Sequence, residues 1–385
     1  MNTKLNSRII FTIPLVLYYI INCLFISKYS IRYEINPLIS NILYFIFASL
    51  AIYFSPVIIN VLEKRIKNSY IFISLSIVAG ILVLQYSIDP YSLQVDRWSA
   101  IHNFIQNLFS GTYPYLAKTH LGGYGSPFPV WQALHIPFYW LGNISLAFVV
   151  VFGVLTYTLP LLLNSYKKAF LFMVLLLISP AFWYEVTVRS DLFYNFLLLM
   201  IICAYIIKKK LSISEYPIGL GVLCGLMLST RLSVFAPLAI TLFSGFIASA
   251  TKNKAIFLGI TILSLTLTFT PLLVWDWNSL LFFQHNPISL QTRQGSVFEV
   301  IFLIALAIFF GSRKFKSIQT TFLYISISFC LFITVTFLHR MINSHFVNQL
   351  FSSSFDITYY NMALPFLMYF LAGNNFQPSK PEAAL

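Results

Sequence analysis

Apolar runs of about 20 residues recur along the whole chain, and this pattern restricts the possible folds more than any other feature. A run of this length is what an α-helix needs to cross the hydrocarbon core of a bilayer. Only 9% of the 385 residues are charged, whereas an ordinary soluble domain has about 25%. We therefore expect an all-α fold, a polytopic transmembrane helix bundle that forms one domain.

The runs predict about twelve spans, and the first is retained because no small-residue cleavage site follows it. The expected spans are residues 9–27, 39–62, 69–87, 143–164, 169–188, 191–207, 217–230, 232–250, 255–275, 297–312, 318–338 and 359–372. The seventh and eighth meet at 229–231 and form either two spans or a broken, re-entrant pair. The expected transmembrane domain covers 1–372, with an N-terminal helix pair in 1–68 and a large outer loop in 88–142. A short cytoplasmic tail follows at 373–385.

The basic residues are unevenly distributed along this topology. Sixteen of the 24 Lys and Arg fall at the N-terminus, in alternate connections or in the tail, with only three of the eleven acidic residues. Because cytoplasmic segments are enriched in Lys and Arg, both termini are expected in the cytoplasm. The other side carries equal numbers of acidic and basic residues, so the topology accounts for the net charge of +13. No nucleic-acid partner is needed to explain it.

The longest stretch that cannot span a membrane is 89–131. Its first part predicts an amphipathic helix over 96–109 that lies in the membrane interface, with an apolar stripe at Trp98, Ile101, Ile105 and Leu108. Gly111 is placed to end this helix. Asp96 stands at its start, where its carboxylate either caps the helix or serves as a catalytic group at the mouth of a cavity.

A loop rich in glycine, proline and tyrosine follows, and it contains Tyr113, Tyr115 and Trp131. These aromatic rings either stack on sugars or belong to the aromatic belt of membrane proteins. Three glycines in residues 122–125 permit the backbone to approach a ligand closely.

Three basic residues at predicted outer junctions are further candidates for ligand binding. Arg189 and Asp191 either pair with each other or face a polar cavity. Arg231, at the break between the seventh and eighth runs, either binds a phosphate through bidentate hydrogen bonds or extends to the interface. Arg97 follows the candidate acid Asp96 directly.

The loop 276–296 contributes His285, Gln291 and Arg293, which suit either sugar hydroxyls and a phosphate or an ordinary solvated loop. No histidine pair has the spacing of a zinc site. The sequence requires no cofactor, although Asp89 and Asp96 are possible ligands of a divalent metal.

These segments resemble the integral-membrane glycosyltransferases of the C superfamily (GT-C), in a mannosyltransferase-like form that uses polyprenyl-phosphate sugars. The resemblance lies in the order of the segments along the chain and in the side of the membrane on which they are expected. The resemblance covers about residues 85–370. It rests on Asp96, Gly111 to Tyr115, Ser126 to Pro129, Ser179-Pro180, Arg189 to Asp191, Gly221 to Pro237, Asn286-Pro287, Gln291-Thr292 and Asp356 to Pro365.

This resemblance implies a multi-pass enzyme of a bacterial inner membrane whose active site faces the periplasm or the outside. A polyprenyl-phosphate sugar is the expected donor, with its phosphate near Arg231, and a glycan, lipid or protein is the acceptor. Asp96 is the expected general base, and the anomeric carbon is inverted.

Two features depart from the family pattern. The first two spans look like an addition to it, and Asp96 is followed by Arg97 rather than by a second acid, which puts a metal requirement in doubt. The alternative function is a transporter or flippase of lipid-linked glycans, although no repeat relates the two halves of the chain. A polymerase of such glycans is a further alternative, but the outer loops 276–296 and 339–358 are modest for that activity.

Overall fold

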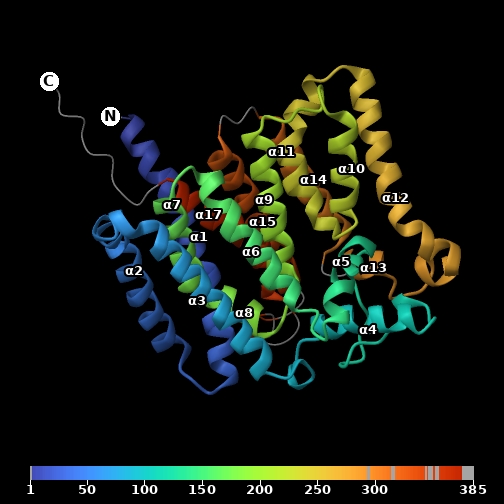
Figure 1. The fold of residues 1–385 in the computed structure, drawn as a ribbon, viewed down its shortest axis with the longest axis horizontal. Coiled ribbons are helices and arrows are strands. Elements are labelled where there is room, and N and C mark those ends of the chain that lie inside the picture. Colours follow the sequence, from blue (N-terminus) through green and yellow to red (C-terminus); the bar gives the residue numbers. More distant parts are fainter. Residues whose placement is uncertain are drawn as a thin grey trace.

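The computed structural model describes residues 2–292, 295–313, 317–342, 345, 350–351 and 355–374. These residues form helices and no β-strand, so the expected all-α fold is confirmed for the described part of the chain (Figure 1). The α-helices are α1 (Asn2–Arg32), α2 (Pro37–Val61), α3 (Ile66–Ser87), α4 (Arg97–Phe109), α5 (Pro129–Trp140), α6 (Leu146–Leu163), α7 (Tyr166–Leu177), α8 (Pro180–Thr187), α9 (Leu192–Lys208), α10 (Pro217–Leu228), α11 (Phe235–Ala248), α12 (Thr251–Leu281), α13 (Pro287–Thr292), α14 (Val297–Gly311), α15 (Ile318–Met341) and α17 (Leu364–Gly373). Short 3-10 helices are η1 (Glu63–Arg65), η2 (Pro90–Ser92), η3 (Pro114–Leu116), η4 (Leu232–Val234) and η5 (Ile357–Met362).

Six helices in the described residues are long and apolar enough to cross a membrane, or seven if one bent pair is counted as a span. They are α1, α2, α3 with η1, α6, α12 and α15, and each matches a predicted span. The chain is therefore a helical membrane protein, but the expected count of twelve is not confirmed. Helices α9, α10, α11 and α14 are shorter apolar helices of 10–17 residues. All ten residues of α17 are buried, so protein rather than lipid surrounds this helix.

The predicted span 169–188 is not one continuous helix. Helices α7 and α8 meet at a bend of 67° between Leu177 and Pro180. Pro180 occupies the first turn of α8, and the Ser179 hydroxyl accepts a hydrogen bond from the backbone N–H of Phe182 at 3.3 Å. Proline disfavours a helical conformation in the residue before it, and Ser is a good N-cap, so the two residues start a new helix.

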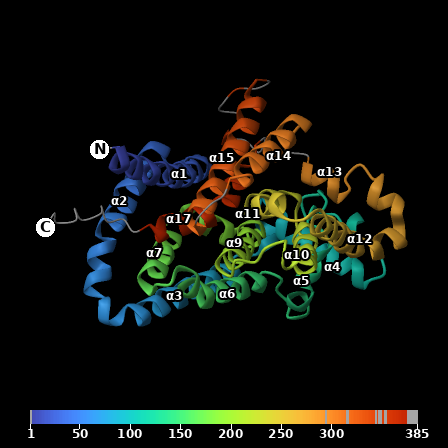
Figure 2. The same cartoon turned by 90° about the horizontal axis from the view of Figure 1, so that it is seen from above.

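The centre of the bundle is formed by α9 and α17, which pack against each other (Figure 2). Helices α2 and α12 lie at opposite edges in both ribbon views and expose large apolar side chains. Phe47 on α2 is 60% exposed, and Ile262 on α12 is 64% exposed. Apolar surface of this extent is typical of a membrane-facing helix.

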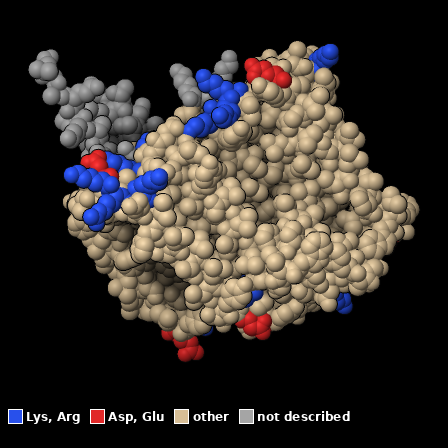
Figure 3. Space-filling model, viewed as in Figure 1, with Lys and Arg blue, Asp and Glu red and all other residues tan. Residues whose placement is uncertain are grey.

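The two ends of the bundle differ in charge and structure. Most of the Lys and Arg visible in Figure 3 lie along its upper edge, where the ends of α2, α7 and α9 are found in Figure 1. Helices α4 and α5 lie toward the lower edge of Figure 1. The predicted basic connections thus gather at one end of the bundle, away from the amphipathic helix.

Candidate functional site

Helix α4 carries the first half of the candidate site, and its apolar stripe fixes its orientation. Trp98, Ile101 and Ile105 are buried as the helical spacing predicts, and Phe104 is buried with them. Leu108 is only half-buried. Gly111 has a φ of 74°, the left-handed conformation that favours glycine after a helix. The predicted helix and its C-terminal glycine are confirmed.

Asp96 precedes α4, but its side chain makes no capping hydrogen bond to the helix. Its Oδ2 accepts the hydroxyl hydrogen of Thr119 at 2.7 Å. The same hydroxyl oxygen accepts from the Gly123 N–H at 2.9 Å. A Cβ atom at Gly123 would lie 2.9 Å from Asp96 Oδ2, so a side chain there would displace the carboxylate. The capping alternative therefore does not describe Asp96.

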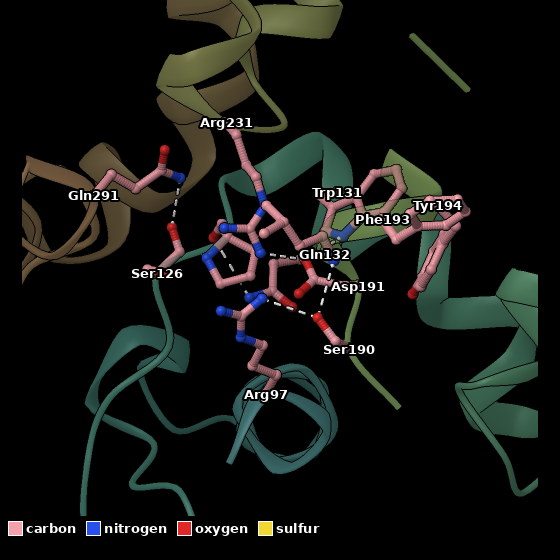
Figure 4. Close-up of polar contacts among 12 residues, drawn as sticks. Arg97, Ser126, Trp131, Gln132, Ser190, Asp191, Phe193, Tyr194, Arg231 and Gln291 are labelled. Carbon is pink, nitrogen blue, oxygen red and sulfur yellow. Dashed lines mark hydrogen bonds and ion pairs between the residues drawn. The ribbon is translucent and has the colours of Figure 1, made fainter. Parts of the chain in front are cut away.

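The main polar cluster lies between α4 and the start of α9, and it joins two arginines (Figure 4). Arg97 donates to Ser190 Oγ at 2.9 Å and to Asp356 Oδ2 at 2.6 Å, and also to the Thr358 hydroxyl. Arg231 reaches the cluster from the other side and forms an ion pair with Asp191.

Asp191 contacts two members of the cluster through one carboxylate oxygen. Its Oδ2 pairs with Arg231 and also accepts a hydrogen bond from the Trp131 indole N–H at 2.8 Å. The side chains of Asp191 and Arg231 are only 2% and 10% exposed. Among the described residues, Asp191 Oδ1 and Arg231 Nε have no hydrogen-bond partner although both are buried. Buried polar atoms in native proteins are almost always paired, so this unused acceptor and donor are suited to a bound water or ligand.

Arg189 does not join this cluster. A pair between Arg189 and Asp191, one of the two alternatives from the sequence, is not formed, since Asp191 pairs with Arg231. Arg189 has a φ of 52°, which turns its side chain toward the end of α3. There it donates to the backbone oxygens of Gln85 and, at 2.7 Å, Ile88. These carbonyls are the unpaired acceptors of a helix C-terminus, where a cation is favoured. Arg189 therefore anchors α3.

Burial and charge act together on the ionisable groups of the cluster and its surroundings. Burial by itself raises the pKa of the Asp356 carboxyl, but Arg97 and the hydrogen bonds from Thr358 outweigh it, so the pKa lies below its ordinary value. Burial lowers the pKa of Arg97, but the surrounding carboxylates, Asp356 first among them, raise it more. Burial lowers the pKa of His135, which keeps that imidazole neutral.

A cavity of about 340 Å³ opens beside Arg231. Most of its wall is apolar, and helices α11, α12, α14 and α15 contribute Phe235, Leu265, Leu303 and Phe332 to it. Its polar lining includes Arg231 and Gln291. Gln291 accepts from the Leu232 N–H at 2.7 Å and donates to Ser126 O at 2.7 Å, so it ties α13 to two other wall segments.

Several predicted binding residues lie elsewhere. The Tyr115 side chain is fully buried, with its hydroxyl donating to Pro127 O at 3.0 Å. Tyr113 is also buried and packs edge-on against Trp275. His285 stacks on Tyr124, with ring centroids 5.1 Å apart. Neither tyrosine nor His285 lines the cavity, and Arg293 lies outside the described residues.

The two possible metal ligands, Asp89 and Asp96, make different contacts. Asp89 is exposed and caps η2 by accepting from the Tyr91 N–H at 3.0 Å. Within the described ranges, no group of three or more His, Cys, Asp or Glu side chains is arranged to hold a metal ion.

Sequence reasoning missed several members of the cluster. Asp356 was expected only as the start of a family-like segment, and Ser190 and Thr358 were not singled out. Trp131 was considered for stacking, whereas the structure uses its N–H as a donor to Asp191. An acid just before the last apolar run was the available signal for Asp356.

The fold and site together define a helical membrane protein with a buried ionic cluster beside an apolar cavity. No protein-family model, curated protein or solved structure matches this chain.

Proposed function

We propose that the protein is a membrane glycosyltransferase that takes a sugar from a polyprenyl-phosphate donor. The observation that carries this proposal is a mostly apolar cavity with a buried arginine, Arg231, in its wall. A donor of this class has the matching parts, an apolar chain and an anionic phosphate. The side on which transfer occurs is proposed to be the extracytoplasmic end, where α4 and α5 lie, because the basic residues gather at the other end.

The ionic cluster supports this assignment through its unused hydrogen-bond capacity. Arg231 keeps Nε unpartnered among the described residues while its Nη2 holds Asp191. A donor phosphate would bind the guanidinium N–H groups that Asp191 does not hold, since arginine presents donors in a planar fork that suits phosphate oxygens. Arg97 would contribute a second positive charge that stabilises the leaving phosphate.

Asp96 is the proposed general base. Among the described residues, no arginine or lysine forms an ion pair with its carboxylate, whereas Asp191 and Asp356 are each paired with an arginine. A carboxylate that is hydrogen-bonded by a neutral hydroxyl remains a better proton acceptor than one held by a guanidinium. Asp96 is half-buried, which leaves it accessible to an acceptor.

In the proposed reaction, an acceptor hydroxyl loses its proton to Asp96 while its oxygen forms a bond to the anomeric carbon. The bond between that carbon and the phosphate oxygen breaks, and polyprenyl phosphate leaves with the electron pair. Attack opposite the leaving group inverts the anomeric configuration. This step needs no oxidant and no nucleotide.

The test is a transfer assay with the full-length protein in nanodiscs. A panel of polyprenyl-phosphate sugars is supplied with membrane-glycan acceptors, once with Mg²⁺ and once with EDTA, because Asp89 and Asp96 are candidate metal ligands. Formation of a glycosylated product that is lost in the Asp96→Asn variant supports the proposal. Donor binding without transfer, together with movement of the lipid-linked sugar across vesicles, would overturn it in favour of transport.

A further inference from the structure

Helix α1, the first of the two helices that look like an addition in sequence, directs buried polar side chains into the bundle. The Tyr18 hydroxyl donates to Leu175 O at 2.7 Å. The Asn22 side-chain oxygen accepts from the Ser179 hydroxyl at 2.7 Å and from the Ala181 N–H at 3.1 Å. These contacts hold both sides of the bend between α7 and α8, so α1 is built into the core.

Lys28 lies further along α1 and reaches the candidate site. Its side chain is buried, with only 4% of the residue exposed, and its Nζ donates to Phe355 O at 2.9 Å. An ionisable residue inside a membrane helix is costly and is usually kept for a functional reason with a definite partner. The partner here is a backbone oxygen 327 positions further along the chain.

The segment that Lys28 contacts, Phe355-Asp356, belongs to both the cavity and the ionic cluster. Phe355 lines the cavity. The next residue, Asp356, pairs with Arg97, and Asp356 Oδ1 accepts the Thr358 N–H at 2.9 Å. Lys28, Phe355, Asp356 and Arg97 therefore form one chain of contacts from α1 to α4.

We propose that Lys28 is a positioning residue that fixes the Phe355-Asp356 segment, so that Phe355 keeps its place in the cavity wall and Asp356 holds Arg97 in place. A charged donor makes a stronger hydrogen bond to a carbonyl than a neutral one does. The inference rests on the proposed function for its kinetic part, but its structural part does not depend on any activity.

The plain alternative is that Lys28 only anchors α1, as Tyr18 does. The two roles predict different effects for matched variants. Lys28→Met keeps an unbranched side chain that is one atom shorter but removes the donor, and Lys28→Arg keeps a charged donor. Tyr18→Phe removes one buried hydrogen bond from the same helix without touching residues 355–358.

The experiment measures hydrogen exchange of peptides that cover 355–362, and transfer kinetics, for the four proteins in nanodiscs. We expect Lys28→Met to raise exchange at 355–362 and to lower kcat about tenfold or more, with a smaller change in the donor KM. Lys28→Arg should keep both the exchange at 355–362 and kcat close to the wild-type values. Tyr18→Phe should change neither quantity, even if it lowers the midpoint of thermal unfolding.

The outcomes separate this inference from the proposed function. Equal exchange at 355–362 in wild-type protein and Lys28→Met would overturn the positioning role, and so would a uniform loss of stability with unchanged kcat in the folded fraction. If Lys28→Met does not fold, Lys28→Gln, which keeps a neutral donor, replaces it and must show an intermediate rise in exchange. Raised exchange in a protein that shows no transfer with any donor would support the positioning role while refuting the glycosyltransferase assignment.

Discussion

Arg97 and Asp356 are 259 residues apart in the chain, yet Arg97 Nη2 lies 2.6 Å from Asp356 Oδ2. This ion pair joins the amphipathic helix α4 to η5 and the last described helix, α17. Because Arg97 also holds Ser190, the pair connects three segments that are remote in sequence. The candidate site is therefore assembled only when the whole bundle has folded.

The first prediction concerns the stability of this pair. Asp356→Asn should destabilise the protein by about 1–3 kcal/mol at pH 7, because it leaves Arg97 partly desolvated without its carboxylate. Solvent screening keeps the effect in this range, since the side chains are 17% and 32% exposed. Thermal unfolding in detergent measures the effect. Glu63→Gln is the control, since it breaks an exposed pair with Lys167 and should leave the midpoint unchanged.

The pair should also make stability sensitive to acid. The pKa of Asp356 is lowered in the folded protein, so its contribution is fully present above the ordinary aspartate pKa of about 3.9. The contribution is lost as the pH falls from that value through the lower folded pKa. The difference in midpoint between wild type and Asp356→Asn should therefore shrink below about pH 4. A difference that stays constant across that window would contradict the assigned pairing.

The second prediction concerns His135, which is 1% exposed. Its Nδ1 donates to Trp131 O at 2.6 Å because a carbonyl only accepts, so Nε2 accepts from the Tyr194 hydroxyl at 2.5 Å. Burial lowers the pKa of the folded imidazole, so folding disfavours protonation. Stability should be full above the unfolded pKa of about 6.5 and should fall as the pH drops below it.

His135→Phe removes this titration, so its midpoint should vary less between pH 7 and pH 5 than that of the wild type. His285→Gln serves as the control, because His285 is only partly buried and stacks on Tyr124. Parallel pH profiles for wild type and His135→Phe would show that this imidazole is not a source of acid sensitivity.

The sequence was sufficient for those features that depend on local pattern. Apolar runs of the right length predicted six long helices that the structure contains, although some of their ends differ from the expected ones by one to two helical turns. The period of Trp98, Ile101 and Ile105 predicted the buried face of α4, and Gly111 predicted its end. Each of these features depends on a pattern of residues that lie close together in the sequence.

Features that depend on distant partners were not predictable in this way. The sequence left open whether Arg189 and Asp191 pair or face a polar cavity, whereas in the structure Arg189 has a left-handed backbone and bonds to the end of α3. Asp191 instead meets Arg231, 40 residues later. The bend at Pro180 did have a local signal, a Ser-Pro helix start, which the uninterrupted apolar run around it obscured.

The third prediction concerns the close packing of α10 against α12. A Cβ atom at Gly225 would lie 2.6 Å from both Ser264 Cβ and Thr261 O, so no side chain fits there without moving the helices. Small residues allow such close approach of membrane helices. Gly225→Ala should cost about 1–3 kcal/mol through overpacking.

Gly219 on the same helix gives a matched control. A Cβ there meets nothing within 4 Å, and the residue is exposed. Gly219→Ala should be neutral or stabilise by up to about 1 kcal/mol, because alanine is the better helix former. Equal thermal midpoints for the two variants would show that α10 and α12 do not pack this closely.

The fourth prediction tests the phosphate site. Arg231→Ala should weaken binding of a polyprenyl-phosphate sugar about tenfold or more, and Arg231→Lys should recover only part of the loss because it lacks the bidentate fork. Titration of a fluorescent donor analogue into nanodiscs measures the affinity. Arg313→Ala, at the basic end of the bundle, is the control and should bind as the wild type does. Unchanged affinity in Arg231→Ala would rule out the assignment.

The last prediction assigns the general base. Asp96→Asn keeps the size of the side chain, and its amide oxygen can still accept the Thr119 hydroxyl, so folding and donor binding should be preserved. The amide cannot take a proton from the acceptor, so turnover should fall about a hundredfold or more.

Gly123→Ala should also slow turnover, because its Cβ would displace the carboxylate without removing it. Asp89→Asn should remain near normal if Asp89 only caps η2. Near-normal turnover in Asp96→Asn would refute the assignment and direct the search for the base to Asp191, whose Oδ1 is unpartnered among the described residues.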